Sequence, residues 1–179
     1  GEWPHIWLEE FQANVLGNPD NVRFQGQHYD FEVESGQLAA FANYELQQTE
    51  QLTIEAGVRL ETIHYDYNNL MLSGTTRDDG STCGSSDGSC RYFRPEDRSD
   101  SFNNLNTQLG ASYQLNPAIT VYSRLASAFR APQVTELYRL QREQQIEDIN
   151  PVELQSFELG LRYNQGNFGA GLNLYAMNK

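Results

Sequence analysis

The chain has no long run of apolar residues, and this lack excludes one class of membrane protein. A spanning helix needs about 20 consecutive apolar residues, whereas hydrophobic residues make up only 39% of the 179 residues and the mean hydropathy is −0.64. The sequence therefore excludes a helical membrane protein. A transmembrane β-barrel remains open, because its strands are apolar only at alternate positions and its loops are polar.

Basic residues are also scarce. The 12 Lys and Arg stand against 24 Asp and Glu, which gives a net charge of −12. Such an acidic chain repels the phosphates of nucleic acids, so we expect no nucleic-acid partner. The sequence has no Gly-rich nucleotide loop and no Ser/His/Asp or Cys/His set with a plausible common site, so we expect no enzyme and no cofactor.

There are only two cysteines, Cys83 and Cys90, and the segment between them is rich in Gly and Ser. This composition predicts a loop. Two cysteines so close in a polar loop favour a disulfide and an oxidising compartment, and a pair of free thiols is the alternative. A zinc site would need more ligands than lie nearby. The acidic residues of 78–79, Asp97 and Asp100 lack the spacing of a calcium-binding EF-hand, so we expect no metal site.

The chain begins Gly1-Glu2-Trp3-Pro4, without an initiator Met, a basic region or an apolar leader. Its last residues, 168–179, look like a strand cut before its next turn. Together these features predict an internal piece of a longer protein, and a mature or trimmed protein is the alternative.

Period-2 alternation dominates what is present. In residues 52–61, every second side chain is apolar, from Leu52 to Leu60. A strand collects such residues on one side, whereas a helix would scatter them around its axis. The same pattern predicts six strands, at 38–46, 52–61, 105–115, 119–129, 156–164 and 168–176. These lengths fit tilted transmembrane strands of about 9–11 residues better than soluble strands of about 5–6.

Short and long connections alternate along the chain. We expect short turns at 47–51, 116–118 and 165–167, the last two of which contain Gly, Pro or Asn. Outer-membrane barrels combine short periplasmic turns with long extracellular loops. The order therefore predicts hairpins at 38–61, 105–129 and 154–179, separated by extracellular loops. The expected loops are 1–37, which we interpret as mainly loop, 62–104, which contains the cysteines, and 130–153.

Four aromatic residues lie close to the short turns on the apolar faces: Tyr44, Tyr113, Tyr163 and Phe168. At one level of a barrel they would form the aromatic girdle found at membrane interfaces. The alternative is that they are ordinary strand aromatics, which are common.

The opposite faces are polar and cannot pack as a dry core, so they predict a water-lined or otherwise polar lumen. The residues expected to face this lumen are Glu55, Arg59, Gln108, Arg124, Glu158 and Arg162. The predicted fold is all-β, an antiparallel meander of about six long strands. Six strands cannot close such a barrel, so we expect the rest of its wall outside this chain.

The segment from Tyr122 to Tyr138 is the most specific in the sequence. Its motif residues are Phe129, Arg130, Ala131, Pro132, Glu136, Leu137 and Tyr138. The segment resembles the barrel signature of TonB-dependent outer-membrane receptors, in which a strand ends in Phe-Arg-Ala-Pro and leads into a loop with Glu-Leu-Tyr. Residues 56–61 and 150–162 resemble two further family segments, and the resemblance covers roughly 37–179.

The motif also has a physical interpretation. Pro132 cannot donate to a β-ladder, so it should end the strand. Arg130 then lies at the extracellular rim, where it can hold a loop carboxylate. Apolar and Gln side chains of 134–147 recur at helical spacing and predict a short helix. For Arg130 and Glu136, a role in folding the loop and direct contact with a ligand are the two alternatives.

The resemblance implies a 22-stranded barrel in the bacterial outer membrane that encloses a plug domain and is energised by TonB. Neither the plug nor the TonB-binding segment is in this chain. The implied cargo is a small molecule, most often a ferric siderophore. Haem is disfavoured because no His lies between Pro132 and Asn150, and His5, His28 and His64 look like solvated surface residues. A passive porin or adhesin-type barrel and a soluble β-sandwich remain as alternatives.

Overall fold

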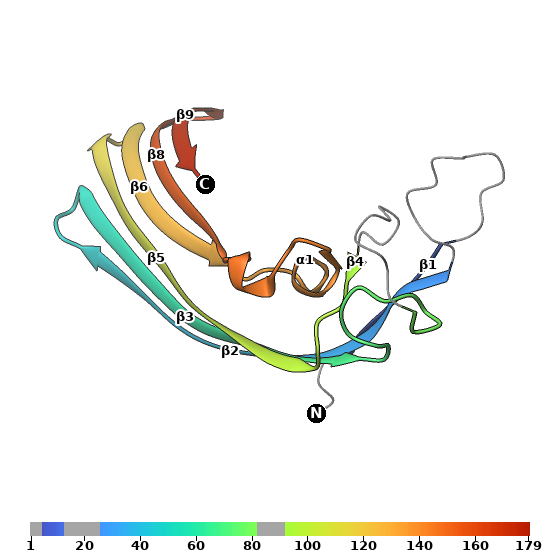
Figure 1. Ribbon diagram of the computed structural model, residues 1–179. Helices are drawn as coiled ribbons and strands as arrows, with labels where there is room; N and C mark the ends of the chain where they lie inside the picture. The colour runs from blue at the N-terminus through green and yellow to red at the C-terminus, as the bar shows by residue number, and fades with distance from the viewer. Residues whose placement is uncertain (1–4, 13–25, 82–91) are drawn as a thin grey trace, which may run out of the picture. The chain divides into compact units, whose positions relative to one another are not determined.

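The computed structural model describes residues 5–12, 26–81 and 92–179, which form mainly β-strands. Seven strands of this described part pair in the order β1-β2-β3-β5-β6-β8-β9, so each strand lies beside its neighbour in the sequence apart from short inserted elements (Figure 1). The strands are β1 (His5–Gln12), β2 (Gly26–Gln47), β3 (Leu52–Asn69), β5 (Arg98–Asn116), β6 (Ile119–Arg130), β8 (Val152–Gln165) and β9 (Phe168–Asn178). The predicted antiparallel meander is confirmed.

The strands are longer than expected, and there is one more of them. The interpretation of 1–37 as mainly loop is wrong where the structure describes it, because β1 and the first part of β2 lie there. The expected loop 62–104 is also too long, since β3 runs to Asn69 and β5 starts at Arg98. These strand ends were not expected because the alternation of apolar and polar residues changes phase within the strands. The apolar residues Phe31 and Val33 fall on odd positions of β2, whereas those of 38–46 fall on even positions.

The three short turns are confirmed between β2 and β3, β5 and β6, and β8 and β9. Side chains within the turns hold them. The Oδ1 atom of Asn116 accepts hydrogen bonds from the backbone nitrogens of Ala118 and Ile119, at 2.9 and 3.0 Å. In the last turn, Gly166 adopts a φ of +57°, which glycine tolerates without strain.

The chain divides into two compact units. Unit 1 contains residues 1–37, 63–102 and 132–150, and unit 2 contains residues 38–62, 103–131 and 151–179. The three longest strands, β2, β3 and β5, therefore each contribute one part to each unit, whereas β6, β8 and β9 belong to unit 2 alone. The units differ in kind, because the buried apolar core lies almost wholly in unit 1, whereas most of the exposed large apolar side chains lie in unit 2.

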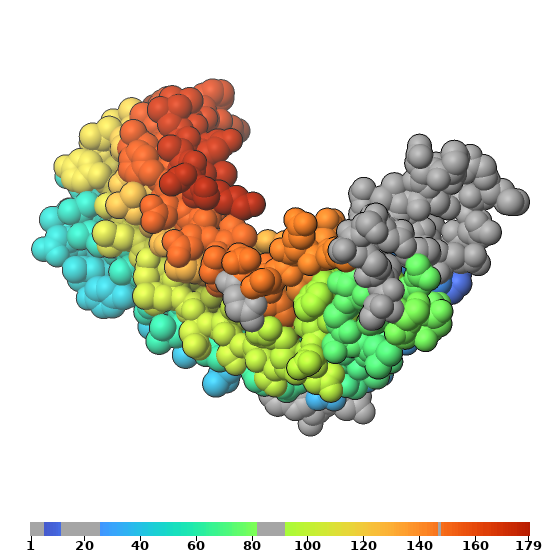
Figure 2. Space-filling model, viewed as in Figure 1, coloured from blue at the N-terminus to red at the C-terminus, as the bar shows by residue number. Residues whose placement is uncertain are grey.

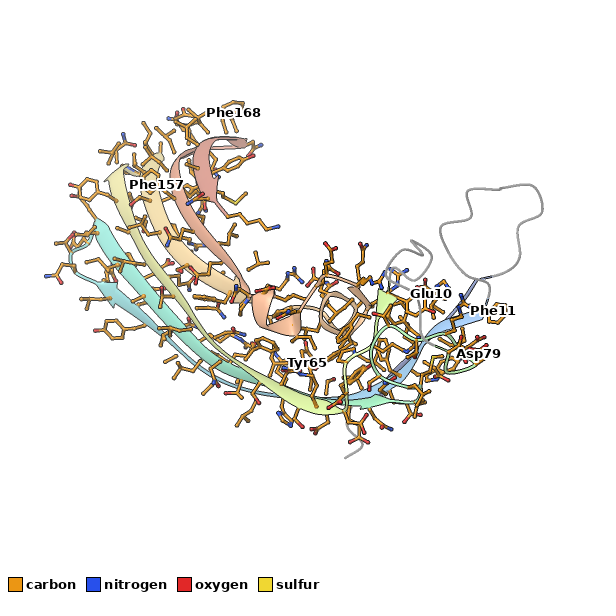
Figure 3. The ribbon with its side chains drawn as sticks, in the orientation of Figure 1. Glu10, Phe11, Tyr65, Asp79, Phe157 and Phe168 are labelled. Atoms are coloured by element: carbon orange, nitrogen blue, oxygen red, sulfur yellow. The ribbon has the colours of Figure 1, made fainter. Side chains whose placement is uncertain are left out.

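Unit 1 has an aromatic core. The ring of Tyr138 stacks on that of Tyr67 with centroids 4.4 Å apart, and its hydroxyl donates to Asp100 at 2.8 Å. Burial and the neighbouring Asp100 raise the pKa of Tyr138, so its hydroxyl stays protonated and can donate. Figure 3 shows Tyr65 between the sheet and the segment that carries α1, and the Tyr65 hydroxyl donates to the carbonyl of Pro132 at 3.3 Å. These contacts fix the segment after β6 to the strands.

That segment contains the expected short helix. Helix α1 (Val134–Tyr138) is followed by β7 (Leu140–Gln141), which pairs with β4 (Tyr92–Phe93), and by a 3-10 turn at Ile146–Asp148. The helix is confirmed but stops earlier than the spacing of 134–147 predicts. The carboxylate of Glu136 accepts the backbone N–H of Gln133 at 2.7 Å, which caps its first turn.

Arg94 is fully buried and joins three segments of unit 1. Its guanidinium donates to the carbonyls of Leu72 at 2.7 Å, His28 at 2.8 Å and Thr76 at 2.6 Å. These bonds compensate the cost of burying a charge by using its rigid set of donors. Arg94 therefore holds the connection after β3 against the start of β2.

Two asparagines lie on the same face of β5, Asn104 and Asn106, and we expect the same substitution to have different effects at the two positions. Asn106 accepts the backbone N–H of Phe129 at 2.6 Å, whereas the amide of the buried Asn104 has no partner among the described residues. In the full-length protein, we expect Asn106→Leu to lower the free energy of unfolding by about 1–3 kcal/mol and Asn104→Leu to be neutral or stabilising. Urea unfolding in detergent micelles measures both. An equal loss in both variants would contradict the prediction.

Candidate membrane surface and lumen

Unit 2 exposes a set of large apolar side chains on one face of its strands. Leu38 is 78% exposed and Leu172 64%, values that no buried core allows. Figure 2 shows β9, in red, with no other element over it in this view, and every residue of β9 is exposed. In the described part of the chain no second sheet packs on these residues, which argues against the soluble sandwich. We call this face of unit 2 the outward face.

The strand registers align the outward residues into rows that cross the strands. One row starts at Leu46 on β2 and passes through the residues Ile54, Ala111, Ser123, Leu159 and Leu174. The first two steps follow from the hydrogen bonds of Gln48 N to Leu52 O, at 2.9 Å, and of Gln114 N to Gln51 O, at 2.8 Å. Each row marks positions directly opposite one another in the sheet.

On each strand the apolar outward residues form one continuous stretch, and the position of this stretch shifts along the strand from β2 to β9. On β2 the stretch ends at Leu46. The row through Leu46 reaches β9 at Leu174. On β9, however, the apolar stretch continues six residues further, to Phe168 (174 − 168). Six residues are roughly 20 Å along a strand, and five strand spacings are roughly 24 Å. The apolar band therefore crosses the strands as if they were tilted by about 40°, within the 35–45° of transmembrane barrels.

Both edges of the band carry polar or amphipathic side chains. At one edge Thr62 and Asn103 face each other on β3 and β5, with Thr62 donating at 2.8 Å. At the other edge the hydroxyl of Tyr113 donates to Gln51 at 2.9 Å, and the rings of Tyr163 and Phe168 lie 6.0 Å apart. Phe168 lies beside the turn that joins β8 to β9 (Figure 3). An apolar layer bounded in this way suits a planar bilayer.

The six residues expected to face a lumen lie together on the inward face of unit 2. Arg124 lies opposite Glu158 in the register and 3.8 Å from the carboxylate of Glu55. Arg59 pairs with Glu61 at 2.6 Å on the same strand. These pairs are partly exposed, so each contributes little to stability. They give the inward face a mixed charge, and their contact with a lumen stays a prediction.

Tyr122 is a further residue of this face, which the alternation of the sequence does not single out. Arg162 lies over its ring at 4.5 Å, and Glu158 accepts a hydrogen bond from Asn173 at 2.6 Å. Tyr122 lies opposite Gly160, and a Cβ atom built on Gly160 would be 2.1 Å from the tyrosine ring. The glycine thus provides the space over which the ring lies. In the sequence, only the glycine on a polar strand face could have indicated that a large side chain lies close to the backbone here.

The family motif residues divide between two environments. Phe129 and Arg130 end β6, as Pro132 predicts, and Ala131 and Pro132 follow it directly. The motif's second part lies in α1, where Leu137 and Tyr138 are fully buried in the core of unit 1. Glu136 caps the helix as described above. This contact supports the loop-folding role for Glu136, and neither alternative for Arg130 is tested.

The cysteines and His28 were the other residues that the sequence singled out. Cys83 and Cys90 lie in 82–91, outside the described residues, so the disulfide stays a prediction. The interpretation of His28 as a solvated residue is wrong: it is buried, stacks on Tyr92 at 4.6 Å and lies 3.8 Å from Glu10. It became buried because β2 begins earlier than expected.

Among the residues that the structure describes, no cluster of His, Cys, Asp and Glu could hold a metal ion. The same part of the chain contains no helix long and apolar enough to cross a membrane.

Comparisons with known proteins identify one family and a similar fold. A family model described as TonB dependent receptor-like, beta-barrel, matches residues 6–179. No curated protein sequence matches the chain. Among solved structures, the open form of the ferric-catecholate import receptor Fiu from E. coli K12 is 18% identical with a TM-score of 0.56, and the match covers 86% of this chain and 21% of Fiu.

A second similar structure is the copper transporter OprC, 16% identical with a TM-score of 0.57, covering 83% of this chain and 22% of OprC. The closed form of Fiu from E. coli K12 gives 19% identity and a TM-score of 0.54, covering 84% and 22%. The chain thus spans about a fifth of the length of these structures. At such identities the similarity supports the fold alone.

The close approach of Tyr122 to Gly160 predicts a matched pair of variants. In the full-length protein, Gly160→Ala should lower the free energy of unfolding by about 1–3 kcal/mol, because the new methyl group overlaps the ring. Gly110→Ala is the control on the same face, since its Cβ would meet ordinary contacts at 3.6 Å. Heat-modifiability on gels measures both. Adding Tyr122→Ala to Gly160→Ala should remove the loss, and a persistent loss would contradict this explanation.

Proposed function

Because the chain belongs to the TonB-dependent receptor-like β-barrel family, we propose that it forms part of the wall of an outer-membrane receptor that actively imports a scarce nutrient. The single observation that carries the membrane location is the tilted apolar band on the outward face of unit 2. In this proposal the band contacts outer-membrane lipid, and the four aromatics near the turns form its girdle. Unit 1 then lies on the extracellular side.

The inward face of unit 2 suits a plug domain within the barrel. Phe41 and Tyr175 lie on this otherwise polar face and are 72% and 74% exposed. A groove of about 420 Å³ on the same face contains Phe41, Arg59 and Gln108. A polar polypeptide with some apolar side chains would cover both kinds of residue. We propose that the protein's own plug is this partner and that TonB acts through the plug.

The distribution of charge bears on the cargo. Nearly all the net charge lies in unit 1, whose described residues contain 15 Asp and Glu against 5 Arg, whereas unit 2 contains 6 acidic and 5 basic residues. An acidic extracellular surface attracts cations and repels anions. We propose a ferric siderophore as the cargo, and this surface favours a neutral or cationic complex over an anionic one.

The membrane location predicts how the effect of a charge depends on depth. Leu109→Arg lies within the band on β5 and should cost about 2–4 kcal/mol, whereas Asn103→Arg, at the edge on the same face, should cost about 0–1 kcal/mol. The reason is that only the first charge faces hydrocarbon. The measurement is the yield of folded full-length protein in the outer membrane. Because Leu109 is 53% exposed, a protein whose outward face meets water would tolerate both variants equally, and that result would rule out the proposal.

The cargo proposal is tested by uptake of radioactive iron into cells that carry the full-length gene and no other ferric receptor. We expect a cationic ferric trihydroxamate to be taken up and an anionic ferric tris-catecholate to compete poorly, by at least about tenfold in concentration. Uptake should stop when TonB is removed. Efficient competition by the catecholate would contradict the charge argument, and uptake without TonB would contradict active import.

A further inference from the structure

A groove on unit 2 lies between two rows of side chains that cross the strands. The polar row consists of Thr107, Ser127, Gln155 and Asn178. The neighbouring apolar row consists of Leu109, Leu125, Phe157 and Ala176. The groove has a volume of about 520 Å³ and reaches across β5, β6, β8 and β9. One wall can therefore form hydrogen bonds and the other cannot.

The groove opens on the outward face. Each strand contributes three consecutive residues to its lining, and the side chain of the middle residue, such as Ala126 or Ser156, belongs to the inward face by alternation. The other groove, which contains Phe41, opens on the inward face. There the flanking residues of each strand, such as Asn43 and Gln108, are inward, and the middle residue is outward. The polar row and the apolar row that form the walls of the groove therefore both lie on the outward face, next to the apolar band.

The tilt of the band gives the groove two different ends. On β9, the last strand described, the groove reaches the polar edge of the band, because Asn178 follows Ala176 on the outward face. On β5 the band continues past Thr107 to Leu105, so this end lies within the apolar layer. Three strand spacings make the part of the groove that the described strands line about 14 Å long. Its occupant must therefore be polar at one end and apolar along its length.

The charge of the lining narrows the occupant further. Among the described residues that line the groove none is charged, and the next outward residue of β8 beyond Gln155 is Glu153. A phosphate head would meet this carboxylate on the outward face, which is unfavourable. Hydroxyls and ester carbonyls instead match the amides of Gln155 and Asn178, which both donate and accept.

We propose that this groove binds a membrane lipid with an uncharged, hydroxyl-bearing head, such as an acylated sugar, and accommodates one of its acyl chains. The head binds at Gln155 and Asn178, and the chain lies along Phe157, Leu125 and Leu109. This inference rests on the proposed membrane location of the outward face. It adds a lipid site that is independent of the lumen and of the cargo.

The test uses the full-length receptor in detergent micelles, native mass spectrometry and two probes with identical chains, monogalactosyl diacylglycerol and phosphatidylglycerol. We expect the galactolipid to be retained more than the phospholipid by about fivefold, the factor of one net hydrogen bond. Ser127→Trp should fill the groove and abolish this retention. Ser123→Trp is the matched control, because it lies on the same strand and face outside the groove.

A second variant separates the head from the chain. Gln155→Leu should remove the preference for the galactolipid while leaving the chain site open. Equal retention by wild type and Ser127→Trp, or equal retention of both lipids by wild type, would overturn the proposal. Each variant is first checked for heat-modifiable barrel in the outer membrane. Wild type that fails this check counts against the membrane location, whereas wild type that passes and retains no lipid counts against the groove alone.

Discussion

Antiparallel backbone pairing commits every second side chain of a strand to the same face, and in unit 2 the two faces need different environments. The outward face presents leucines and aromatics that no part of the described chain covers, and the inward face presents Arg124, Glu158 and Arg162. A shift of one residue in the register would exchange these faces completely. The pairing therefore determines which surface can meet lipid and which can meet a polar lumen.

The same pairing explains how the inward face accommodates large side chains. Tyr122 lies over Gly160, and Asn43 and Gln108 both approach Gly57, whose Cβ would be 2.7 Å from either. A glycine on one strand thus provides room for long side chains on its neighbours. The contact of Arg162 with Tyr122 depends on this arrangement, because Gly160 leaves room for the tyrosine ring.

Unit 1 uses the inward face differently. There Phe31, Tyr67 and the residues of α1 make a buried core, and the tyrosine hydroxyls donate to Asp100 and to backbone carbonyls. A single strand such as β2 therefore has a polar inward face in unit 2 and an apolar one in unit 1. The family motif links the two, since Phe129 and Arg130 end a strand and Leu137 and Tyr138 enter the core.

The sequence by itself determined the strands of unit 2, their turns and the two faces, because alternation and turn chemistry are local properties of the chain. It did not reveal β1 or the outer ends of β2, β3 and β5, where the apolar residues change phase near residues 35–37 and 62–64. Only the tertiary structure decided that Phe31 and Tyr67 pack beneath Tyr138, that Tyr122 covers Gly160 and that the apolar band is tilted. Each of these depends on register between distant segments, which no local pattern specifies.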